Sequence, residues 1–284
     1  MSETWTPLRL IGWTQSYFAG LGIDAPRLTA EILLANALRC ERLRLYLDFD
    51  KPLAEPELAA FRDLVRRRAG GEPTAYLTGR KDFLGRTFRV DERVLVPRPE
   101  TELLAEAALE ALPEEGEALD LCTGSGCIAV SLALGRPGAR VTAVDLSPAA
   151  LELARENAQA LGARVELLEG DLYAPLAPGR RFRVIAANPP YVPSAELEGL
   201  SREVGREPRL ALDGGPDGLR VLRPLVEGAP ARLDAGGTLV AEMHESHAEI
   251  LPRLSLAAGF ASAETRRDLA GLPRYLVARL AAHA

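Results

Sequence analysis

The sequence predicts an α/β fold: a doubly wound, mostly parallel sheet preceded by a small all-helical domain. Up to about residue 73, apolar residues recur at helical spacing and no convincing strand is present. Beyond residue 117, β-rich segments alternate with helical segments, which is typical of a parallel sheet with crossover helices. The length of 284 residues exceeds that of a typical single domain, so we expect two domains.

Residues 1–73 are predicted to form the helical domain. Segments 28–38 and 58–65 place apolar side chains at i, i+3 and i+4, which indicates amphipathic helices. The arginines at 66–68 precede Gly70 and Gly71, where cations suit the negative end of a helix. We interpret these arginines as a solvated last turn rather than as a binding patch.

Residues 74–96 are predicted to form a β-hairpin connector, because spaced aromatic and β-branched residues are interrupted there by glycines. Residues 97–284 are predicted to form the α/β domain, beginning with a helix over about 100–111. Its expected strands are 118–122, 140–145, 164–168, 183–187, 237–242 and 274–280, and its other expected helices lie near 127–134, 148–161, 218–233 and 248–258. Ser147 as N-cap with Pro148 at the first helical position marks the start of the helix 148–161.

Composition excludes several classes of protein. Hydrophobic residues make up 47% and charged residues 26% of the chain, which excludes a disordered scaffold. The net charge of −6 disfavours nucleic acid as a partner, and DNA is not expected. Neither a targeting segment nor a run of eighteen apolar residues is evident, so we expect a cytoplasmic protein without membrane contact. His244 and His247 lack a third ligand, and we expect no metal.

The first strand of the predicted sheet leads into a glycine-containing loop. It comprises Cys122, Thr123, Gly124, Ser125 and Gly126 and opens a helix. Glycines there let the backbone approach a ligand closely, and the helix N-terminus suits an anionic group. The same pattern fits a dinucleotide-binding turn or a purely structural turn.

Acidic residues follow the next two predicted strands. Asp145 ends the second strand, from which a carboxylate can reach the two hydroxyls of a ribose. Asp171 and Leu172 follow the third, where the carboxylate could accept a hydrogen bond from an adenine amino group. Either Asp alone could be a cap or loop residue, but three such strand ends together favour an adenosine site.

The fourth predicted strand ends in Asn188-Pro189-Pro190-Tyr191, the most specific motif in the chain. Two prolines stiffen the loop and remove two donors, which leaves carbonyl groups beside the asparagine amide. Asn188 and the Pro189 carbonyl could accept hydrogen bonds from a planar NH₂ group, and the Tyr191 ring could pack on the plane of that group.

Together these motifs resemble the S-adenosylmethionine-dependent methyltransferases that modify planar nitrogens, and more narrowly the HemK/PrmC family of release factor N5-glutamine methyltransferases. The narrower resemblance rests on five further segments. They are Pro73–Gly79, Phe83–Gly85, Val96–Glu102, Glu207-Pro208 and Ala211–Leu219. Cys122 stands where the family usually has glycine.

The resemblance implies a seven-stranded Rossmann-like methyltransferase sheet and a cytoplasmic monomer. The cofactor would be S-adenosyl-L-methionine, with S-adenosyl-L-homocysteine as product. The substrate would be the glutamine of the Gly-Gly-Gln motif in class I peptide chain release factors, which the helical domain would help to dock. Methyl transfer would be direct and in line, without a covalent enzyme intermediate.

Site residues follow from the motifs and the resemblance. The expected catalytic residues are Asn188, Pro189 and Tyr191. The expected cofactor-binding residues are Cys122, Thr123, Gly124, Ser125, Gly126, Asp145, Asp171, Leu172 and Asn188. The expected substrate-binding residues are Asn188, Pro189, Pro190, Tyr191, Phe83 and Arg98.

Other functions stay open on the residues alone. The same chemistry could serve a glutamine of a ribosomal protein, an adenine in DNA or a base in ribosomal RNA. A basic target-recognition region, which DNA methylation would need, is missing from residues 1–75, where ten acidic and ten basic side chains balance. A nucleotide-dependent dehydrogenase or an inert binding module could also carry the glycine loop, but the Asn-Pro-Pro-Tyr motif argues against both.

Overall fold

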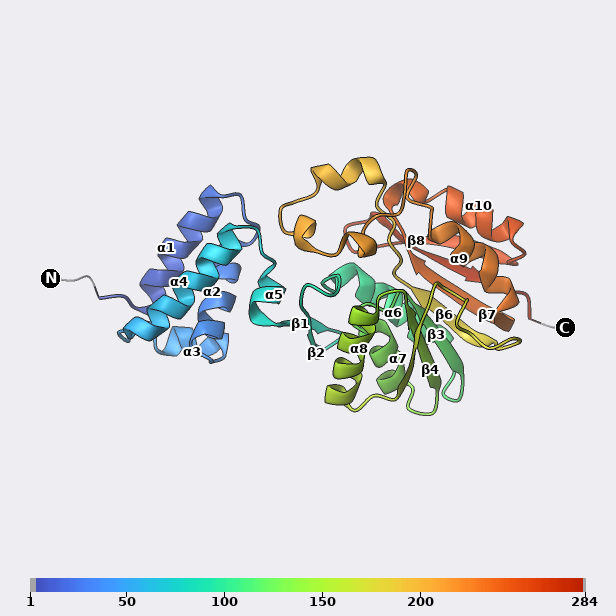
Figure 1. The fold of residues 1–284 in the computed structure, drawn as a ribbon, viewed down its shortest axis with the longest axis horizontal. Helices are drawn as coiled ribbons and strands as arrows, with labels where there is room; N and C mark the ends of the chain where they lie inside the picture. Colours follow the sequence, from blue (N-terminus) through green and yellow to red (C-terminus); the bar gives the residue numbers. More distant parts are fainter. Residues whose placement is uncertain (1–3, 283–284) are drawn as a thin grey trace. The chain divides into compact units, whose positions relative to one another are not determined.

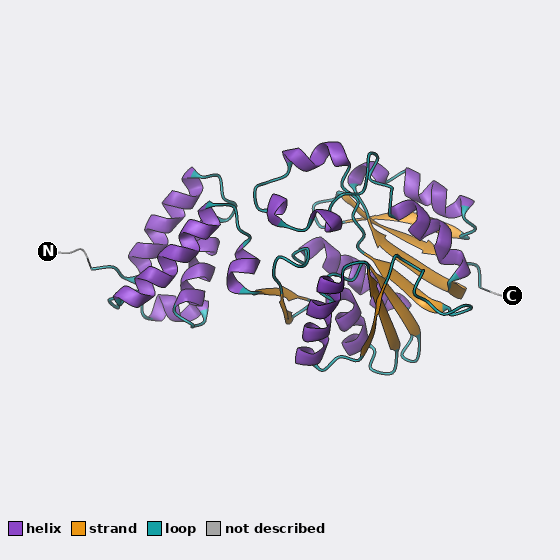
Figure 2. Ribbon diagram, viewed as in Figure 1, coloured by secondary structure: helices purple, strands orange, loops and turns teal. Residues whose placement is uncertain are grey.

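The structure, a computed structural model, describes residues 4–282 and divides into two compact units. The first unit runs to Gly79 and also includes Ser201–Arg206, whereas the second comprises Arg80–Leu200 and the chain from Glu207 onward. In Figure 1 the helices α1 to α5 belong to the first unit and every strand belongs to the second. Figure 2 shows the same division by secondary structure.

The first unit is a helical bundle with its own hydrophobic core. Its helices are α1 Pro7–Gly20, α2 Pro26–Ala37, α3 Arg42–Leu47, α4 Glu55–Ala69 and α5 Thr74–Thr78. The core joins the apolar faces that the periodicity predicted, including Phe18 from α1, Leu34 from α2 and Phe61 from α4. The helix α5 extends this unit beyond residue 73, and Ser201–Arg206 joins it from a distant part of the sequence.

The three arginines at the end of α4 differ in their surroundings. Arg66 and Arg67 are exposed, as expected for a solvated last turn. Arg68 is buried, and its guanidinium pairs with Glu203 at 2.5 Å. The prediction of a solvated turn is therefore wrong for Arg68, which fastens Ser201–Arg206 to the bundle.

The second unit contains a seven-stranded sheet and a separate two-stranded hairpin. The order in the sheet is β5-β4-β3-β6-β7-β9-β8, in which the first five strands run parallel and β9 and β8 are antiparallel to their neighbours. The strands are β1 Arg80–Phe83, β2 Arg86–Arg89, β3 Glu117–Leu121, β4 Arg140–Asp145, β5 Val165–Glu169, β6 Phe182–Ala187, β7 Leu233–Glu242, β8 Ser262–Arg267 and β9 Pro273–Arg279. The predicted fold class is confirmed.

Helices cover both faces of this sheet. They are α6 Pro99–Ala111, α7 Cys127–Gly135, α8 Pro148–Leu161, α9 Leu222–Gly228 and α10 Ile250–Ala257, with short 3₁₀ turns at Ser194–Gly199, Val204–Arg206, Arg209–Ala211, Ala229–Ala231 and Glu245–His247. Alternate strand residues enter two cores, because side chains along a strand point to opposite faces. Ala118 and Val184 pack with α6, α7 and α8, whereas Leu119 and Ile185 pack with α9 and α10.

One expected element is wrong, and one strand of the structure was not expected. A helix over 218–233 is wrong, because Gly218 has a left-handed φ of +73° and α9 begins only at Leu222. The strand β8 was not predicted from the pattern: its sequence Ser-Ala-Glu-Thr-Arg-Arg lies at the sheet edge with mostly exposed side chains, so no apolar alternation marks it.

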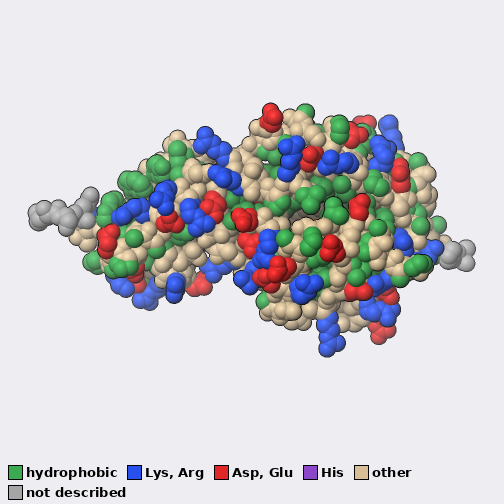
Figure 3. All heavy atoms as spheres, viewed as in Figure 1, with side chains coloured by type: hydrophobic (Ala, Val, Ile, Leu, Met, Phe, Trp, Pro, Cys, Tyr) green, Lys and Arg blue, Asp and Glu red, His purple; other side chains and the backbone are tan. Residues whose placement is uncertain are grey.

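The surface mixes charges of both signs. In the view of Figure 3, Lys and Arg side chains are interspersed with Asp and Glu side chains over both units. Within residues 4–282, no helix has the length and apolar character needed to cross a membrane.

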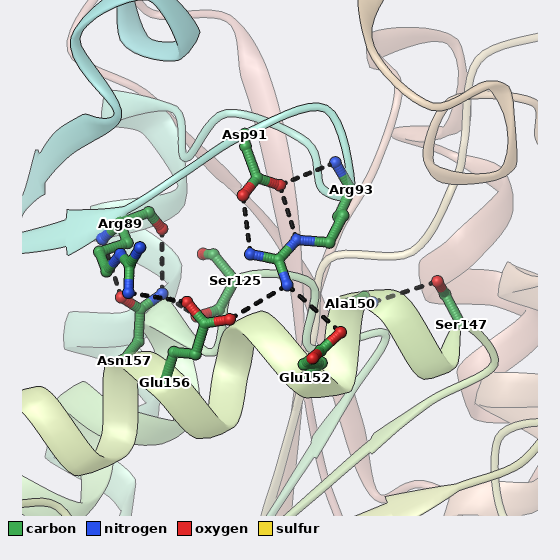
Figure 4. A network of polar contacts seen from close by, with 9 residues as sticks. All are labelled: Arg89, Asp91, Arg93, Ser125, Ser147, Ala150, Glu152, Glu156 and Asn157. Carbon is green, nitrogen blue, oxygen red and sulfur yellow. Dashed lines mark hydrogen bonds and ion pairs between the residues drawn. The ribbon is translucent and has the colours of Figure 1, made fainter.

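One buried side chain of α8 connects the hairpin to the loop after β3. Asn157 is 1% exposed, and its Oδ1 accepts a hydrogen bond from the Arg89 backbone N–H at 2.8 Å. Its Nδ2 donates to the carbonyl oxygens of Arg89 at 3.0 Å and Ser125 at 2.8 Å (Figure 4). Nearby, the Arg93 guanidinium pairs with Asp91 and with Glu156 of α8. Asn157 thus places the glycine loop relative to α8.

We expect Asn157→Ala to lower the free energy of unfolding by roughly 2–5 kcal/mol, because three hydrogen bonds are lost and buried backbone groups are left unpaired. Urea denaturation measures this, and Gln159→Ala, an exposed change on the same helix, serves as the control. Equal unfolding midpoints for the two variants would contradict the role of Asn157.

Candidate active site

A cavity of about 140 Å³ lies where the strand order of the sheet reverses direction. From β3, the chain continues to β4 and β5 on one side, and β6 and β7 lie on the other. Ligands of open α/β sheets bind at the carboxyl ends of strands at such a point. The cavity brings together many of the predicted site residues: Cys122, Thr123, Gly124, Ser125, Asp145, Asp171, Leu172, Asn188 and Pro190.

The loop after β3 has the backbone conformation that its glycines predicted. Gly124 and Gly126 have left-handed φ values of +54° and +79°. A Cβ on Gly126 would lie 3.1 Å from the Cβ of Ala154, so this glycine allows α7 and α8 to approach closely. Cys122, the family's usual glycine position, has a φ of +59°, which is uncommon for a side chain with a Cβ. Gly126 does not itself line the cavity.

Asp145 ends β4 and is held by two backbone donors. Its Oδ2 accepts from the Gly124 N–H at 2.8 Å, and its Oδ1 accepts from the Ser147 N–H at 2.9 Å. Burial raises the pKa of this carboxyl above its ordinary value, whereas the backbone donors oppose the rise. Each oxygen of a carboxylate can accept a second hydrogen bond, so Asp145 can receive two hydroxyl groups from a ligand in the cavity.

The Asn-Pro-Pro-Tyr loop leaves β6 beside the cavity. Asn188 lines the cavity, and its Nδ2 donates to the Thr101 hydroxyl at 3.2 Å, which leaves Oδ1 to accept from a ligand. Pro190 also lines the cavity, whereas Pro189 does not. The Tyr191 ring packs against the α9/α10 core, and its hydroxyl donates to Glu242 at 2.8 Å. Tyr191 is therefore not a cavity-lining residue.

The segment Leu212–Gly214 is hydrogen-bonded to Val192, the residue that follows the Asn-Pro-Pro-Tyr loop. The Val192 N–H donates to the Leu212 carbonyl at 2.9 Å, and the Gly214 N–H donates to the Val192 carbonyl at 2.8 Å. The segment thus runs beside the residues that follow Tyr191. This pairing places part of the Ala211–Leu219 motif beside the end of the Asn-Pro-Pro-Tyr motif.

Two predicted substrate contacts lie elsewhere. Phe83 is 1% exposed and meets Phe88 edge to face in the core, so it has no surface to offer a substrate. The aromatic residues of the hairpin thus serve packing, and a substrate contact of Phe83 stays a prediction. Arg98 does not line the cavity; its guanidinium pairs with the buried Glu207 at 2.5 Å.

Several lining residues were not predicted individually. They are Arg93, Val94, Leu95, Pro97, Thr101, Cys127, Ile128, Val144, Leu146, Ser147, Ala150, Gly170, Pro208, Leu210, Ala211 and Val221. Four of these residues fall inside motifs on which the family resemblance rests: Pro97, Thr101, Pro208 and Ala211. That resemblance was the only signal in the sequence that could have pointed to them. The walls are largely apolar, so the cavity suits a ligand with an apolar body and a hydroxyl-bearing end.

The fold is that of a methyltransferase. The family described as "Methyltransferase small domain" matches residues 99–202, and the family "PrmC N-terminal domain" matches residues 9–79. A 16S rRNA methyltransferase of T. thermophilus, solved with AdoMet and guanosine, is similar in fold, with a TM-score of 0.52 and 23% identity over 71% of this chain and 49% of that chain. A methyltransferase of Pyrococcus furiosus gives a TM-score of 0.54 and 19% identity over 70% of this chain and 91% of that chain.

Relatives similar over the full length define the family more narrowly. A "Release factor glutamine methyltransferase" of Geobacter sulfurreducens is 45% identical over 98% of both chains. Proteins with the same description are 44% identical in Chlorobaculum tepidum, over 96% of this chain and 97% of that one, and 43% identical in Rhodopirellula baltica, over 97% and 98%. The chain belongs to the release factor glutamine methyltransferase family, which confirms the resemblance and excludes the dehydrogenase and the inert module.

Asp120 is a buried carboxyl beneath the glycine loop. Its Oδ2 accepts from the Thr123 hydroxyl at 2.6 Å and from the Ala129 N–H at 3.1 Å, while Oδ1 has no hydrogen-bond partner among the described residues. Burial raises the pKa of Asp120 from 3.8 to about 7. Because the folded protein then binds more protons than the unfolded chain between these values, stability falls as pH rises through this window.

Asp120→Asn removes this titration while an amide oxygen can still accept both hydrogen bonds. We expect the variant to gain stability relative to the wild type as pH rises from 4 to 7, by up to about 1.4 kcal/mol per pH unit. Denaturant unfolding of both proteins across this range measures the difference. A difference that stays constant with pH would show that Asp120 does not titrate there.

Proposed function

We propose that this protein transfers the methyl group of S-adenosyl-L-methionine to the side-chain amide nitrogen of the glutamine in the Gly-Gly-Gln motif of class I peptide chain release factors. The observation that carries the proposal is the orientation of Asn188. Its NH₂ group is engaged by Thr101, so its Oδ1 remains to accept a hydrogen bond from an acceptor amide in the cavity. The family relationship supports the choice of a release factor as substrate.

The residues at the ends of β3, β4 and β5 suit the proposed cofactor. Asp145 would accept the two ribose hydroxyls, because each of its oxygens keeps a lone pair beyond its backbone hydrogen bond. Asp171 and Leu172 would contact the adenine from the loop after β5, and residues 122–126 would approach the methionine portion. When bound, S-adenosyl-L-methionine supplies a methyl group activated by the positive charge on its sulfur.

Positioning of the acceptor is the main task of the protein in this mechanism. The lone pair of an amide nitrogen is delocalised into the carbonyl, which makes the nitrogen a poor nucleophile. Asn188 Oδ1 would accept one N–H of the glutamine amide and align its nitrogen with the methyl carbon. The second acceptor that the sequence predicts, the Pro189 carbonyl oxygen, belongs to a residue that does not line the cavity, and its role stays a prediction. In the proposed transfer the nitrogen would form the new N–C bond as the S–C bond breaks, and its excess proton would leave to water. Such alignment can lower a barrier by several kcal/mol.

The helical unit would serve the release factor rather than the cofactor. The proposed cofactor contacts all lie in the second unit, and the first unit has its own core and an exposed apolar surface that includes Trp13 and Tyr17. These two rings stack with centroids 5.3 Å apart on α1. We propose that residues 1–73 contribute to recognition of the protein partner, and that the enzyme acts as a cytoplasmic monomer.

We expect Asp145→Ala to weaken binding of S-adenosyl-L-methionine by about 1.5–3 kcal/mol, which is roughly 10- to 150-fold in Kd, because the ribose hydroxyls lose a charged acceptor. Calorimetric titration measures the Kd. Glu169→Ala is the matched control, since Glu169 ends the neighbouring strand β5 but does not line the cavity. An unchanged Kd in folded Asp145→Ala would remove this residue from the site.

Asn188→Ala should act on methyl transfer more than on cofactor binding. We expect single-turnover transfer to a release factor to slow by roughly 10²–10³-fold, the loss typical of a positioned polar group worth about 3–4 kcal/mol in the transition state. The Kd of the cofactor should change by less than about threefold, which is under 1 kcal/mol, because the proposed partner of Asn188 is the acceptor amide and not the adenosine.

Asn188→Asp tests whether the reaction needs only a hydrogen-bond acceptor at this position or needs a neutral amide. It keeps an oxygen of similar position, so partial activity is expected if acceptance alone matters. Loss as complete as in Asn188→Ala would show that the neutral amide is essential. Transfer at the wild-type rate in both variants would disprove the proposed acceptor site.

A further inference from the structure

A buried carboxylate outside the predicted motifs lies behind Asn188. Glu242 is the last residue of β7 and is 1% exposed. Because Ala241 pairs with Ala187 of β6, Glu242 lies level with the start of the Asn-Pro-Pro-Tyr loop. Burial raises the pKa of Glu242 above its ordinary value, and the Thr101 and Tyr191 hydroxyls counteract that rise.

Two hydroxyl groups donate to this carboxylate. The Thr101 hydroxyl in the first turn of α6 donates to Oε2 at 2.6 Å, and the Tyr191 hydroxyl donates to Oε1 at 2.8 Å. Thr101 in turn accepts the Nδ2–H of Asn188 at 3.2 Å. Both ends of the four-residue loop are thereby tied to one carboxylate, Tyr191 directly and Asn188 through Thr101.

The direction of these hydrogen bonds is set by Glu242. When Glu242 is ionised, its carboxylate only accepts, so the single hydrogen of the Thr101 hydroxyl points to Glu242 and the Thr101 oxygen can only accept from Asn188. The Asn188 amide must therefore present NH₂ to Thr101. A flipped amide would place Oδ1 against an oxygen whose hydrogen is already committed, which would leave two buried acceptors facing each other.

We propose that Thr101 and Glu242 are positioning residues, which fix the orientation of the Asn188 amide so that its oxygen, and not its NH₂ group, faces the acceptor. The proposal rests on the proposed role of Asn188. The network explains how a neutral asparagine can serve here. The chain of hydrogen bonds selects which end of its amide faces the acceptor. It also gives the Tyr191 hydroxyl a part in holding the loop.

A contribution to stability does not explain why a carboxylate is buried at position 242. No ion pair to Glu242 is found within residues 4–282, and Arg274, whose charge lowers the pKa of Glu242, pairs with Asp268 at 2.9 Å. A buried carboxylate that only hydroxyls satisfy stabilises a fold less than an apolar residue of similar size. Thr101 also lines the cavity, so the network ends at the site rather than in the core.

The hydroxyl of Thr101 can be removed almost without change of shape. We expect Thr101→Val to lower kcat for release factor methylation by about 10- to 100-fold, because Asn188 loses the partner that fixes its amide. The KM for the release factor and the Kd of S-adenosyl-L-methionine should each stay within about threefold of the wild type, a change under 1 kcal/mol. Thr101→Ser restores the hydroxyl and should recover most of kcat.

A matched control exists on β4. The Thr142 hydroxyl donates to Glu166 at 2.9 Å and accepts from Arg180 at 2.7 Å, the same chemistry outside the cavity. Thr142→Val should cost stability in urea denaturation but leave kcat unchanged. A loss of kcat in Thr142→Val equal to that in Thr101→Val would show a general effect of removing a buried hydroxyl and would overturn the proposal.

Double variants separate this inference from the proposed function. In Asn188→Ala, the further change Thr101→Val should cost no additional kcat, because the amide that Thr101 orients is gone. A wild-type rate for Thr101→Val, with Asn188→Ala defective, would overturn the positioning role alone. A wild-type rate for Asn188→Ala would overturn the proposed function itself.

Glu242→Gln tests whether the carboxylate sets the direction. A glutamine amide can accept from only one of the two hydroxyls through its oxygen, so one hydroxyl must reverse. We expect kcat to fall by about 10-fold or more, with the Kd of the cofactor unchanged within threefold. Wild-type kcat in Glu242→Gln would contradict a directing role for the charge.

Discussion

The parallel pairing of β3 with β4 on one side and β6 on the other is the constraint on which the site depends. Leu121, the last residue of β3, pairs with Val144 and with Ala187. The loops that follow these strands therefore begin at the same level of the sheet. The glycine loop, Asp145 and Asn188 meet for this reason, although up to about 66 residues of sequence separate them. A slip of one residue in either pairing would turn these side chains toward the opposite face.

Three buried or partly buried carboxyl groups either line the cavity or hydrogen-bond to residues that line it, and burial raises the pKa of each one. Asp120, Asp145 and Glu242 each receive two hydrogen bonds from backbone N–H groups or hydroxyls, which offsets part of the cost of burial. Such groups lower stability relative to an apolar core and are typical of functional sites. The two hydrophobic cores on the faces of the sheet supply the stability that permits them.

The sequence predicts elements well where local and tertiary signals agree. The strand Arg140–Asp145 and the helix Pro148–Leu161 were predicted to the residue, because a buried apolar strand leads into a Ser-Pro helix start. The exposed edge strand β8 carries no such pattern. Within the site, the strand-end motifs identified the cavity, whereas Thr101 and Glu242 lie 141 residues apart and meet only through the packing of α6 on β7. Nor could the periodicity of the sequence show that the Phe83 side chain is buried in the core.

Localisation of the transferred methyl group tests the central claim most directly. The wild-type protein would be incubated with methyl-labelled S-adenosyl-L-methionine and a purified class I release factor, followed by peptide mapping with fragmentation. Ribosomal protein and ribosomal RNA would be offered in parallel reactions. The account predicts label on the side-chain nitrogen of the glutamine in the Gly-Gly-Gln motif of the release factor. Label on another residue, or only on the ribosomal protein or RNA, would contradict it.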